Sequence, residues 1–120
     1  MAKVFEYSAT GEVAPDSNPE ELALAALVRC SLASLEFFAE RRGLQVEGTG
    51  AADAVVTKGE DGRFGFAEID VGLDVRVEPA VEEEALGELL DKAEWGCFIG
   101  ASLKTKPRYE WRVNGEVVSR

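Results

Sequence analysis

The stretch SNPEELALAALVRCS, residues 17–31, decides the fold of this chain. Asn18 is a favoured helix N-cap, and Glu21 stands three residues after it, as in a capping box. The proline between them suits the first helical position, where its missing N–H costs nothing. Alanine and leucine then dominate the sequence. We therefore predict one long helix that runs to about Arg42 and ends at Gly43, a residue suited to the left-handed turn after a helix.

This helix is apolar around almost its whole circumference. Between residues 22 and 39 the only polar side chains are Arg29, Ser31, Ser34 and Glu36. A helix of this kind must be covered on most sides, and a single sheet covers only one. We therefore expect a second copy of the chain to cover the remainder, in a two-fold homodimer. The alternative is an alanine-rich flank that stays exposed to solvent.

Two further periodic segments complete the expected architecture. Residues 67–77 alternate between apolar and polar side chains, which predicts a strand with one wet face. Residues 81–94 carry an apolar stripe at helical spacing and predict a second helix. We also expect strands at 3–10, 44–57 (with a bulge near Gly48 and Gly50) and 109–113, and a short helical segment at 97–103. The fold class is α+β: an antiparallel sheet packed on a long central helix and a second helix, as one domain over residues 1–120.

Composition excludes several classes of function. The formal net charge is −10 and the chain contains no histidine. Nucleic acids and anionic membranes require clustered Lys and Arg, so neither is an expected partner. Without histidine, Ser-His-Asp and Cys-His catalysis and most zinc sites are excluded, and two cysteines cannot complete a four-thiolate cage. We expect no bound metal.

The N-terminal sequence indicates where the protein works. Residues 1–10 contain Lys3 and Glu6 and lack the continuous apolar run of a signal peptide. The apolar helix is barely long enough to cross a membrane and contains Arg29 and Glu36, so we do not interpret it as a span. A reducing cytoplasm is therefore the expected compartment.

The two cysteines, Cys30 and Cys97, stand 67 positions apart in the chain. In a reducing compartment a pair of thiols is catalytic, redox-active or simply buried. The plainest interpretation is that each fills a small apolar space in the core, as most free cysteines do. The asparagine-proline-glutamate segment before Cys30, with a single second cysteine in the chain, favours thiol redox chemistry instead.

Residues 17–31, the long helix, the strand pair and the second helix followed by Cys97 together resemble the OsmC/Ohr superfamily, the osmotically inducible and organic-hydroperoxide-resistance proteins. The resemblance covers about residues 17–113. It implies a tightly intertwined homodimer with active sites at the subunit interface. It also implies thiol-dependent reduction of organic hydroperoxides.

Matched position by position, the resemblance assigns three catalytic residues. Cys30 corresponds to the peroxidatic cysteine, Cys97 to the resolving cysteine, and Glu20 to a glutamate that organises the reactive thiol. No cofactor is expected to be bound. An external dithiol would reduce the enzyme, and the resemblance suggests a lipoyl group.

One departure from the family pattern bears on activity. The family's peroxidases stabilise the thiolate with an arginine near the N-terminus, but residues 1–17 contain no arginine, and Lys3 is the only cation there. The candidates to replace it are Arg63 and Arg76, from this chain or a partner, and then Arg29. The alternative function is a catalytically weak or inactive dimer that binds a small apolar ligand at the subunit interface.

Overall fold

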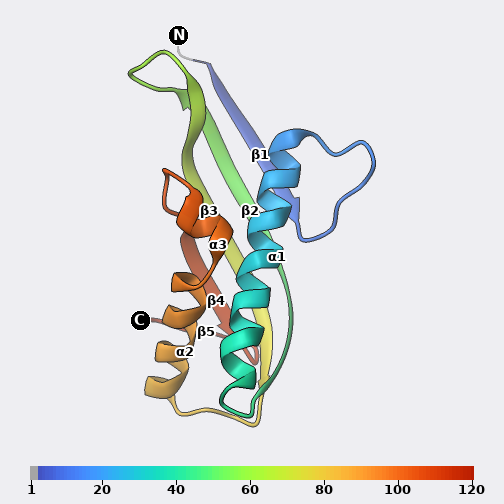
Figure 1. Cartoon of the computed structure of the whole chain (residues 1–120), viewed down its shortest axis with the longest axis vertical. Helices are drawn as coiled ribbons and strands as arrows, with labels where there is room; N and C mark the ends of the chain where they lie inside the picture. Colours follow the sequence, from blue (N-terminus) through green and yellow to red (C-terminus); the bar gives the residue numbers. More distant parts are fainter. Residues whose placement is uncertain (1–2) are drawn as a thin grey trace.

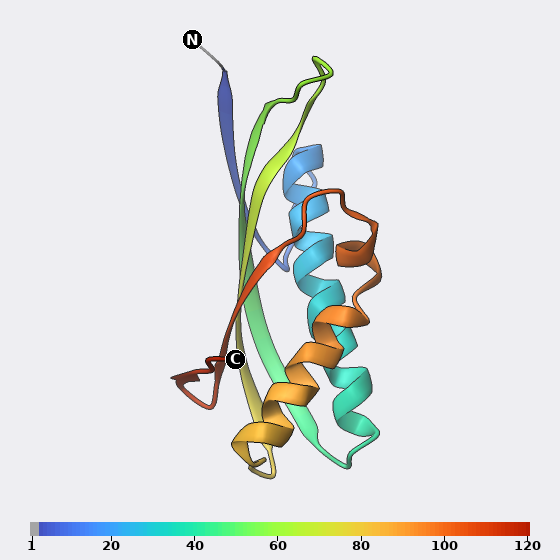
Figure 2. The ribbon, with the colours of Figure 1, turned by 90° about the vertical axis from the view of Figure 1, so that its left-hand side faces the viewer.

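The computed structural model describes residues 3–120; Met1 and Ala2 lie outside the described residues. Within that range one sheet has the order β1-β2-β3-β4-β5, with β1 at Val4–Thr10, β2 at Gln45–Lys58, β3 at Phe64–Glu78, β4 at Arg108–Val113 and β5 at Glu116–Val117. The helices are α1 (Pro19–Glu40), α2 (Glu83–Trp95) and α3 (Phe98–Ser102). All three lie on one face of the sheet (Figures 1 and 2). The predicted α+β class, with a sheet covered by a long helix and a second helix, is confirmed.

The sheet is mixed, so the prediction of a purely antiparallel sheet is wrong at one pair. β3 and β4 run parallel, from Asp70 opposite Arg108 to Val75 opposite Val113. Parallel neighbours cannot be joined by a tight turn and need a crossover connection. Here the crossover contains α2 and α3, and it therefore carries Cys97 to the helix-covered face of the sheet.

The start of α1 confirms the capping box. The Asn18 side chain accepts a hydrogen bond from the Glu21 backbone N–H at 2.7 Å, and the Glu21 carboxylate accepts one from the Asn18 N–H at 2.9 Å. The helix ends at Glu40, two residues before the predicted end, and Gly43 follows with φ +72°. The second helix begins two residues later than predicted and ends one residue later.

The predicted bulge near Gly48 and Gly50 is also wrong, because β2 pairs regularly with β3 there. A Cβ on Gly50 would lie 2.5 Å from Leu73 Cδ2 and 3.0 Å from Val28 Cγ1. The glycine is therefore explained by the Leu73 side chain of β3, which occupies the space of a Cβ, together with the close passage of α1 over β2. The register shift falls instead between Val55 and Val56, where Ala67 is the extra residue of β3.

This bulge changes which side chains of β3 enter the core. From Ile69 to Val77 the predicted alternation is observed, with every odd position buried. Before the bulge the phase reverses, so that Ala67 is exposed and Phe66 is half-buried against the core. The inner face of the sheet packs against the buried stripe of α1, which includes Leu24, Leu27, Val28 and Leu35.

Helix α1 is long and apolar enough to cross a membrane by length and composition alone. In this fold, however, 44% of its most apolar window is buried inside the structure. The helix lies along the sheet (Figure 2), which is the position of a core helix. Its remaining flank is exposed in the single chain and includes Leu22, Ala33 and Phe37.

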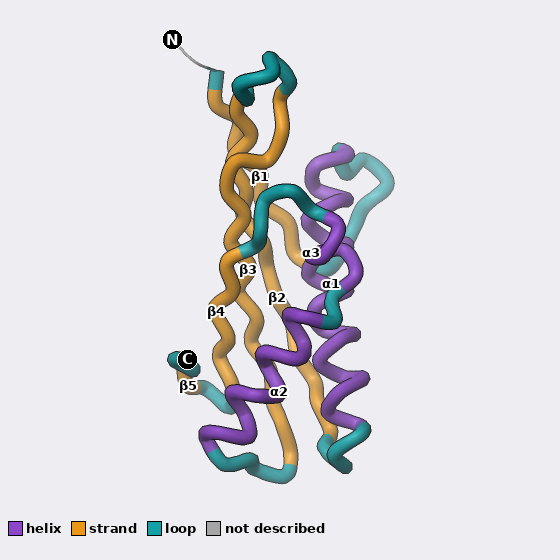
Figure 3. The backbone as a smooth tube through the Cα atoms, turned by 60° about the vertical axis from the view of Figure 1, so that its left-hand side comes forward, coloured by secondary structure: helices purple, strands orange, loops and turns teal. Residues whose placement is uncertain are grey.

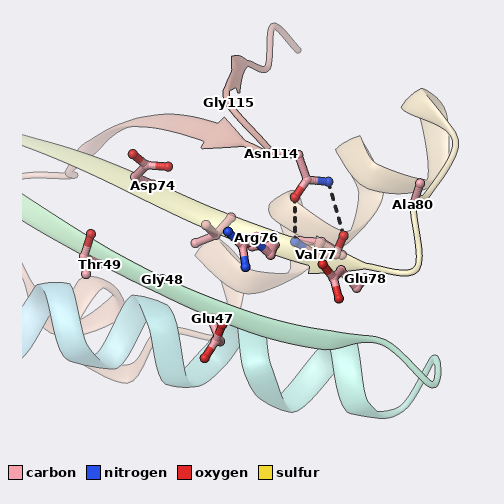
Figure 4. Close-up of a pocket in the computed structure, with 11 residues that line it drawn as sticks. Glu47, Gly48, Thr49, Asp74, Arg76, Val77, Glu78, Ala80, Asn114 and Gly115 are labelled. Carbon is pink, nitrogen blue, oxygen red and sulfur yellow. Dashed lines mark hydrogen bonds between the residues drawn. The ribbon is translucent and has the colours of Figure 1, made fainter.

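The face of the sheet opposite the helices is polar. A shallow depression of about 780 Å³ lies there, with Glu47, Asp74 and Arg76 among its lining residues (Figure 4). At its edge the two-residue turn between β4 and β5 has positive φ at both Asn114 and Gly115, as type I′ turns require. The Asn114 side chain accepts from the Val77 N–H at 3.0 Å and donates to the Val77 carbonyl at 3.2 Å.

Candidate functional site

The fold brings the two cysteines together. Cys30 lies in the middle of α1 and is half-buried, whereas Cys97 is the N-cap of α3 and is fully buried. Figure 3 shows α3 beside the middle of α1. Both thiols are free, and the Cys97 sulfur is close enough to be one of the causes that raise the pKa of Cys30. If these two thiols form a disulfide with little motion, we expect their Cα atoms to lie within about 7 Å of each other.

Gly96 makes this approach possible, because α2 passes directly over α1 at its C-terminal end. A Cβ on Gly96 would lie 2.6 Å from Phe38 Cε2 and 2.9 Å from Ser34 Oγ. The Ser34 hydroxyl also donates to the Ala93 carbonyl at 2.7 Å and joins the two helices. The residue after this tight crossing is Cys97, so the crossing fixes the position of the second thiol.

Polar groups surround the Cys97 sulfur although it is buried. The Gly100 backbone N–H donates to it at 3.4 Å, and the Ser31 hydroxyl lies 3.6 Å away. The Tyr109 hydroxyl lies 3.2 Å from Ser31 Oγ. Gly100 leaves room for this cluster, since a Cβ there would lie 3.2 Å from the Tyr109 hydroxyl.

The surroundings of Cys30 favour the neutral thiol. Burial is the largest cause that raises the pKa of Cys30 above its ordinary value, and Cys97 raises it further. The backbone N–H groups of Ile99 and Phe98 act in the opposite direction, because they donate hydrogen bonds to the sulfur. Within residues 3–120, no cation is among the causes of this shift.

The fold does not bring Glu20 to the thiols within one chain. Glu20 lies in the first turn of α1, and the helix continues without a break to Cys30 and beyond. Ten residues of helix separate the two by about 15 Å along the axis. A role for Glu20 beside a thiol therefore requires a site that a second chain completes.

The three candidate arginines also lie elsewhere in the single chain. Arg63 is in the β2–β3 hairpin, where it forms an ion pair with Asp61 at 2.9 Å. Arg76 projects from the polar face of the sheet (Figure 4). Arg29 is exposed, and its side chain packs near Gly11, in the loop after β1.

Apolar side chains are exposed next to the cysteines. Phe98 is 81% exposed and Trp95 is 76% exposed, and both are within two residues of Cys97. Sequence reasoning did not identify Ser31 and Tyr109 as part of the site. The only signal for Ser31 is that a hydroxyl stands in an otherwise apolar helix, and for Tyr109 that its strand alternation places it on the helix-covered face.

A family model described as OsmC-like protein matches residues 11–112. No curated protein matched. Among solved structures, an OsmC-like protein of unknown function from Vibrio cholerae has a TM-score of 0.69 at 23% identity, over 78% of this chain. The chain spans 62% of the length of that protein.

Two organic hydroperoxide resistance proteins have the same fold. The one from Elizabethkingia anophelis has a TM-score of 0.62 at 24% identity, over 81% of this chain and 67% of its own. OhrB of Bacillus subtilis has a TM-score of 0.55 at 22% identity, over 95% of this chain and 98% of its own. At these identities the structures establish the shared fold, and the family model covers most of the chain. The chain therefore belongs to the OsmC-like protein family.

Proposed function

We propose that this protein is a thiol-dependent peroxidase that reduces organic hydroperoxides, with Cys30 as the peroxidatic and Cys97 as the resolving cysteine. One observation carries the proposal: two free thiols from distant parts of the chain meet, one half-exposed and one buried. The exposed thiol can meet a substrate, and the buried one is held back to react with the product. The shared fold with organic hydroperoxide resistance proteins supports the same reaction class.

The proposed reaction has two steps. The Cys30 thiolate attacks the outer oxygen of the hydroperoxide, the O–O bond breaks, and the alkoxide takes up a proton and leaves as an alcohol. The sulfur of Cys97 then attacks the Cys30 sulfenic acid, the S–O bond breaks, and the hydroxide leaves with the Cys97 proton as water. An external dithiol, such as a lipoyl group, reduces the resulting disulfide by thiol–disulfide exchange. This cycle suits the reducing cytoplasm.

Substitution of each cysteine tests these roles. Cys30→Ser should abolish hydroperoxide consumption. Cys97→Ser should permit one turnover and leave a sulfenic acid on Cys30 that dimedone traps and mass spectrometry detects. Equal consumption by wild type and Cys30→Ser would refute the assignment of Cys30.

The alternative function is binding of a small apolar ligand. The exposed Phe98 and Trp95 beside the thiols favour it, because exposed aromatic side chains that gather in one place mark binding surfaces. Thiol titration before and after one equivalent of cumene hydroperoxide separates the two functions. Rapid loss of both thiols supports the peroxidase, and two inert thiols support the binding protein.

We also propose that the active unit is a homodimer, because α1 exposes an apolar flank in the single chain. Ala33 lies on this flank and is exposed, so Ala33→Asp should leave an isolated chain folded. If the flank is covered by a second copy, the unpaired buried carboxylate should split the dimer or prevent folding. Sedimentation of the wild type and the variant measures this. A folded monomeric wild type would remove the basis for an interfacial site.

A further inference from the structure

The buried hydroxyl of Ser31 touches three groups, and its own proton is already committed. Ser31 is fully buried, and its Oγ donates to the Leu27 carbonyl at 2.8 Å. A serine hydroxyl carries one proton and can accept two hydrogen bonds. Its remaining contacts, with Cys97 Sγ at 3.6 Å and with the Tyr109 hydroxyl at 3.2 Å, are therefore contacts in which Ser31 accepts.

The directions of the other hydrogen bonds follow from this. With the Ser31 proton committed, we infer that the Cys97 S–H and the Tyr109 hydroxyl are the donors in their contacts with Ser31 Oγ. Burial raises the pKa of Tyr109, so its phenol keeps its proton at neutral pH and remains a donor. One lone pair of the Cys97 sulfur accepts from the Gly100 N–H. The second lone pair is left for the neighbouring sulfur of Cys30.

We propose that Ser31 is a positioning residue for Cys97: its oxygen accepts the Cys97 S–H, which turns the free lone pair of the buried sulfur toward Cys30. The proposal rests on the proposed function only for the oxidation of Cys30 by a hydroperoxide. The chemistry it predicts, attack of Cys97 on an oxidised Cys30, can be measured without any peroxide.

The first test uses dithiobis(nitrobenzoate). Cys30, the more exposed thiol, attacks the reagent disulfide and becomes a mixed disulfide with release of one thionitrobenzoate. Cys97 then attacks the Cys30 sulfur, the mixed disulfide breaks, a second thionitrobenzoate leaves, and the Cys97 proton passes to the buffer. The first phase reports Cys30, and the second phase reports the attack by Cys97.

Ser31→Ala should leave the first phase unchanged and slow the second by roughly fivefold, the factor that one ordinary hydrogen bond is worth. Ser31→Thr should restore the second phase. The matched control is Thr105→Ala, which removes a partly buried hydroxyl that also donates to a backbone carbonyl, that of Phe66 at 2.6 Å, away from the crossing of α1 and α2. The proposal would be overturned if the second phase were the same in Ser31→Ala and wild type, if Thr105→Ala slowed it equally, or if the wild type released a single equivalent.

Infrared spectroscopy tests the hydrogen bond from Cys97 to Ser31 directly. In Cys30→Ser, Cys97 is the one remaining thiol, so the infrared S–H stretching band belongs to it alone. Adding Ser31→Ala should move that band to higher frequency, because the thiol loses its acceptor. Adding Tyr109→Phe, which keeps the ring stacked on Trp111, should leave the band near its original position. A shift caused by Tyr109→Phe alone would make tyrosine the acceptor and overturn the proposal.

These results are separable from the proposed function. Suppose that the wild-type thiols do not react with hydroperoxide, but that Ser31→Ala slows the second phase of thionitrobenzoate release. The peroxidase proposal then fails and the positioning role stands. If hydroperoxide is consumed but Ser31→Ala has no effect on either test, the positioning role fails alone.

Discussion

Gly96→Ala is the sharpest test of how the second thiol is positioned. The backbone at Gly96 has φ −85° and ψ 0°, which alanine can adopt. On backbone entropy alone, alanine would therefore stabilise the protein by about 0.4–1 kcal/mol. The sign of the effect is decided by the space around the new methyl group.

That space is occupied. The methyl carbon would lie 2.6 Å from Phe38 Cε2 and 2.9 Å from Ser34 Oγ, where carbon contacts normally lie at about 3.5–4.0 Å. The Phe38 ring must therefore move, or α2 must lift from α1. Overpacking of this kind costs about 1–3 kcal/mol. After subtraction of the entropy gain, we expect a net loss of about 1–2 kcal/mol.

Urea unfolding of the reduced protein, followed by circular dichroism, measures this loss. The control is Gly87→Ala on the same helix, whose methyl group would meet only Arg120 Cγ at 3.9 Å and should stabilise by about 0.5–1 kcal/mol. Gly96→Ala should also slow the attack of Cys97 on Cys30. The argument that this crossing fixes Cys97 would be refuted by a Gly96→Ala protein that is as stable as wild type and releases the second thionitrobenzoate at the wild-type rate.

Four further predictions concern local features. Asn18→Ala should lower the free energy of unfolding by about 1 kcal/mol through loss of the cap, whereas Glu20→Ala should change it by less than about 0.5 kcal/mol; equal losses would contradict the capping box. Gly50→Ala should destabilise the protein by about 1–3 kcal/mol, because its methyl group would overlap a side chain of β3, and unchanged urea midpoints would count against this packing. Burial raises the pKa of Cys30, so its alkylation rate in Cys97→Ser should still rise between pH 7 and 9, and a plateau by pH 6 would reveal a stabilising cation. With the folded pKa above the unfolded one, ionisation of the unfolded thiol should lower stability as the pH rises above about 9, and Cys30→Ser should remove this effect.

Local signals predicted α1 well. The capping box, the proline between its members and Gly43 each act within a few residues, so their effect can be read from adjacent sequence. The alternation from Ile69 onward was equally clear, because large apolar side chains occupy every inward position. The bulge at Ala67 was missed because alanine is small enough for either face and gives no sign of a change in phase.

The sequence pattern could not predict features that depend on residues far apart in the chain. The parallel pairing of β3 with β4 depends on how the crossover packs, and strand alternation is the same for either direction. The meeting of Cys30 and Cys97 was expected from the family resemblance, and their periodicity did not require it. Ser31 was missed because a lone serine in a helix is ordinary, and only the folded chain shows the second cysteine beside it.

The crossover that makes β3 and β4 parallel has a consequence for folding. Cys97 reaches α1 only once α2 has docked on that helix at Gly96, so the thiol pair is a product of tertiary packing. Closing so long a loop is slow compared with local helix formation. During synthesis or refolding the chain would therefore carry two independent thiols, and rapid attack of Cys97 on a mixed disulfide at Cys30 would appear late. The time at which this attack becomes rapid would therefore mark the final stage of folding.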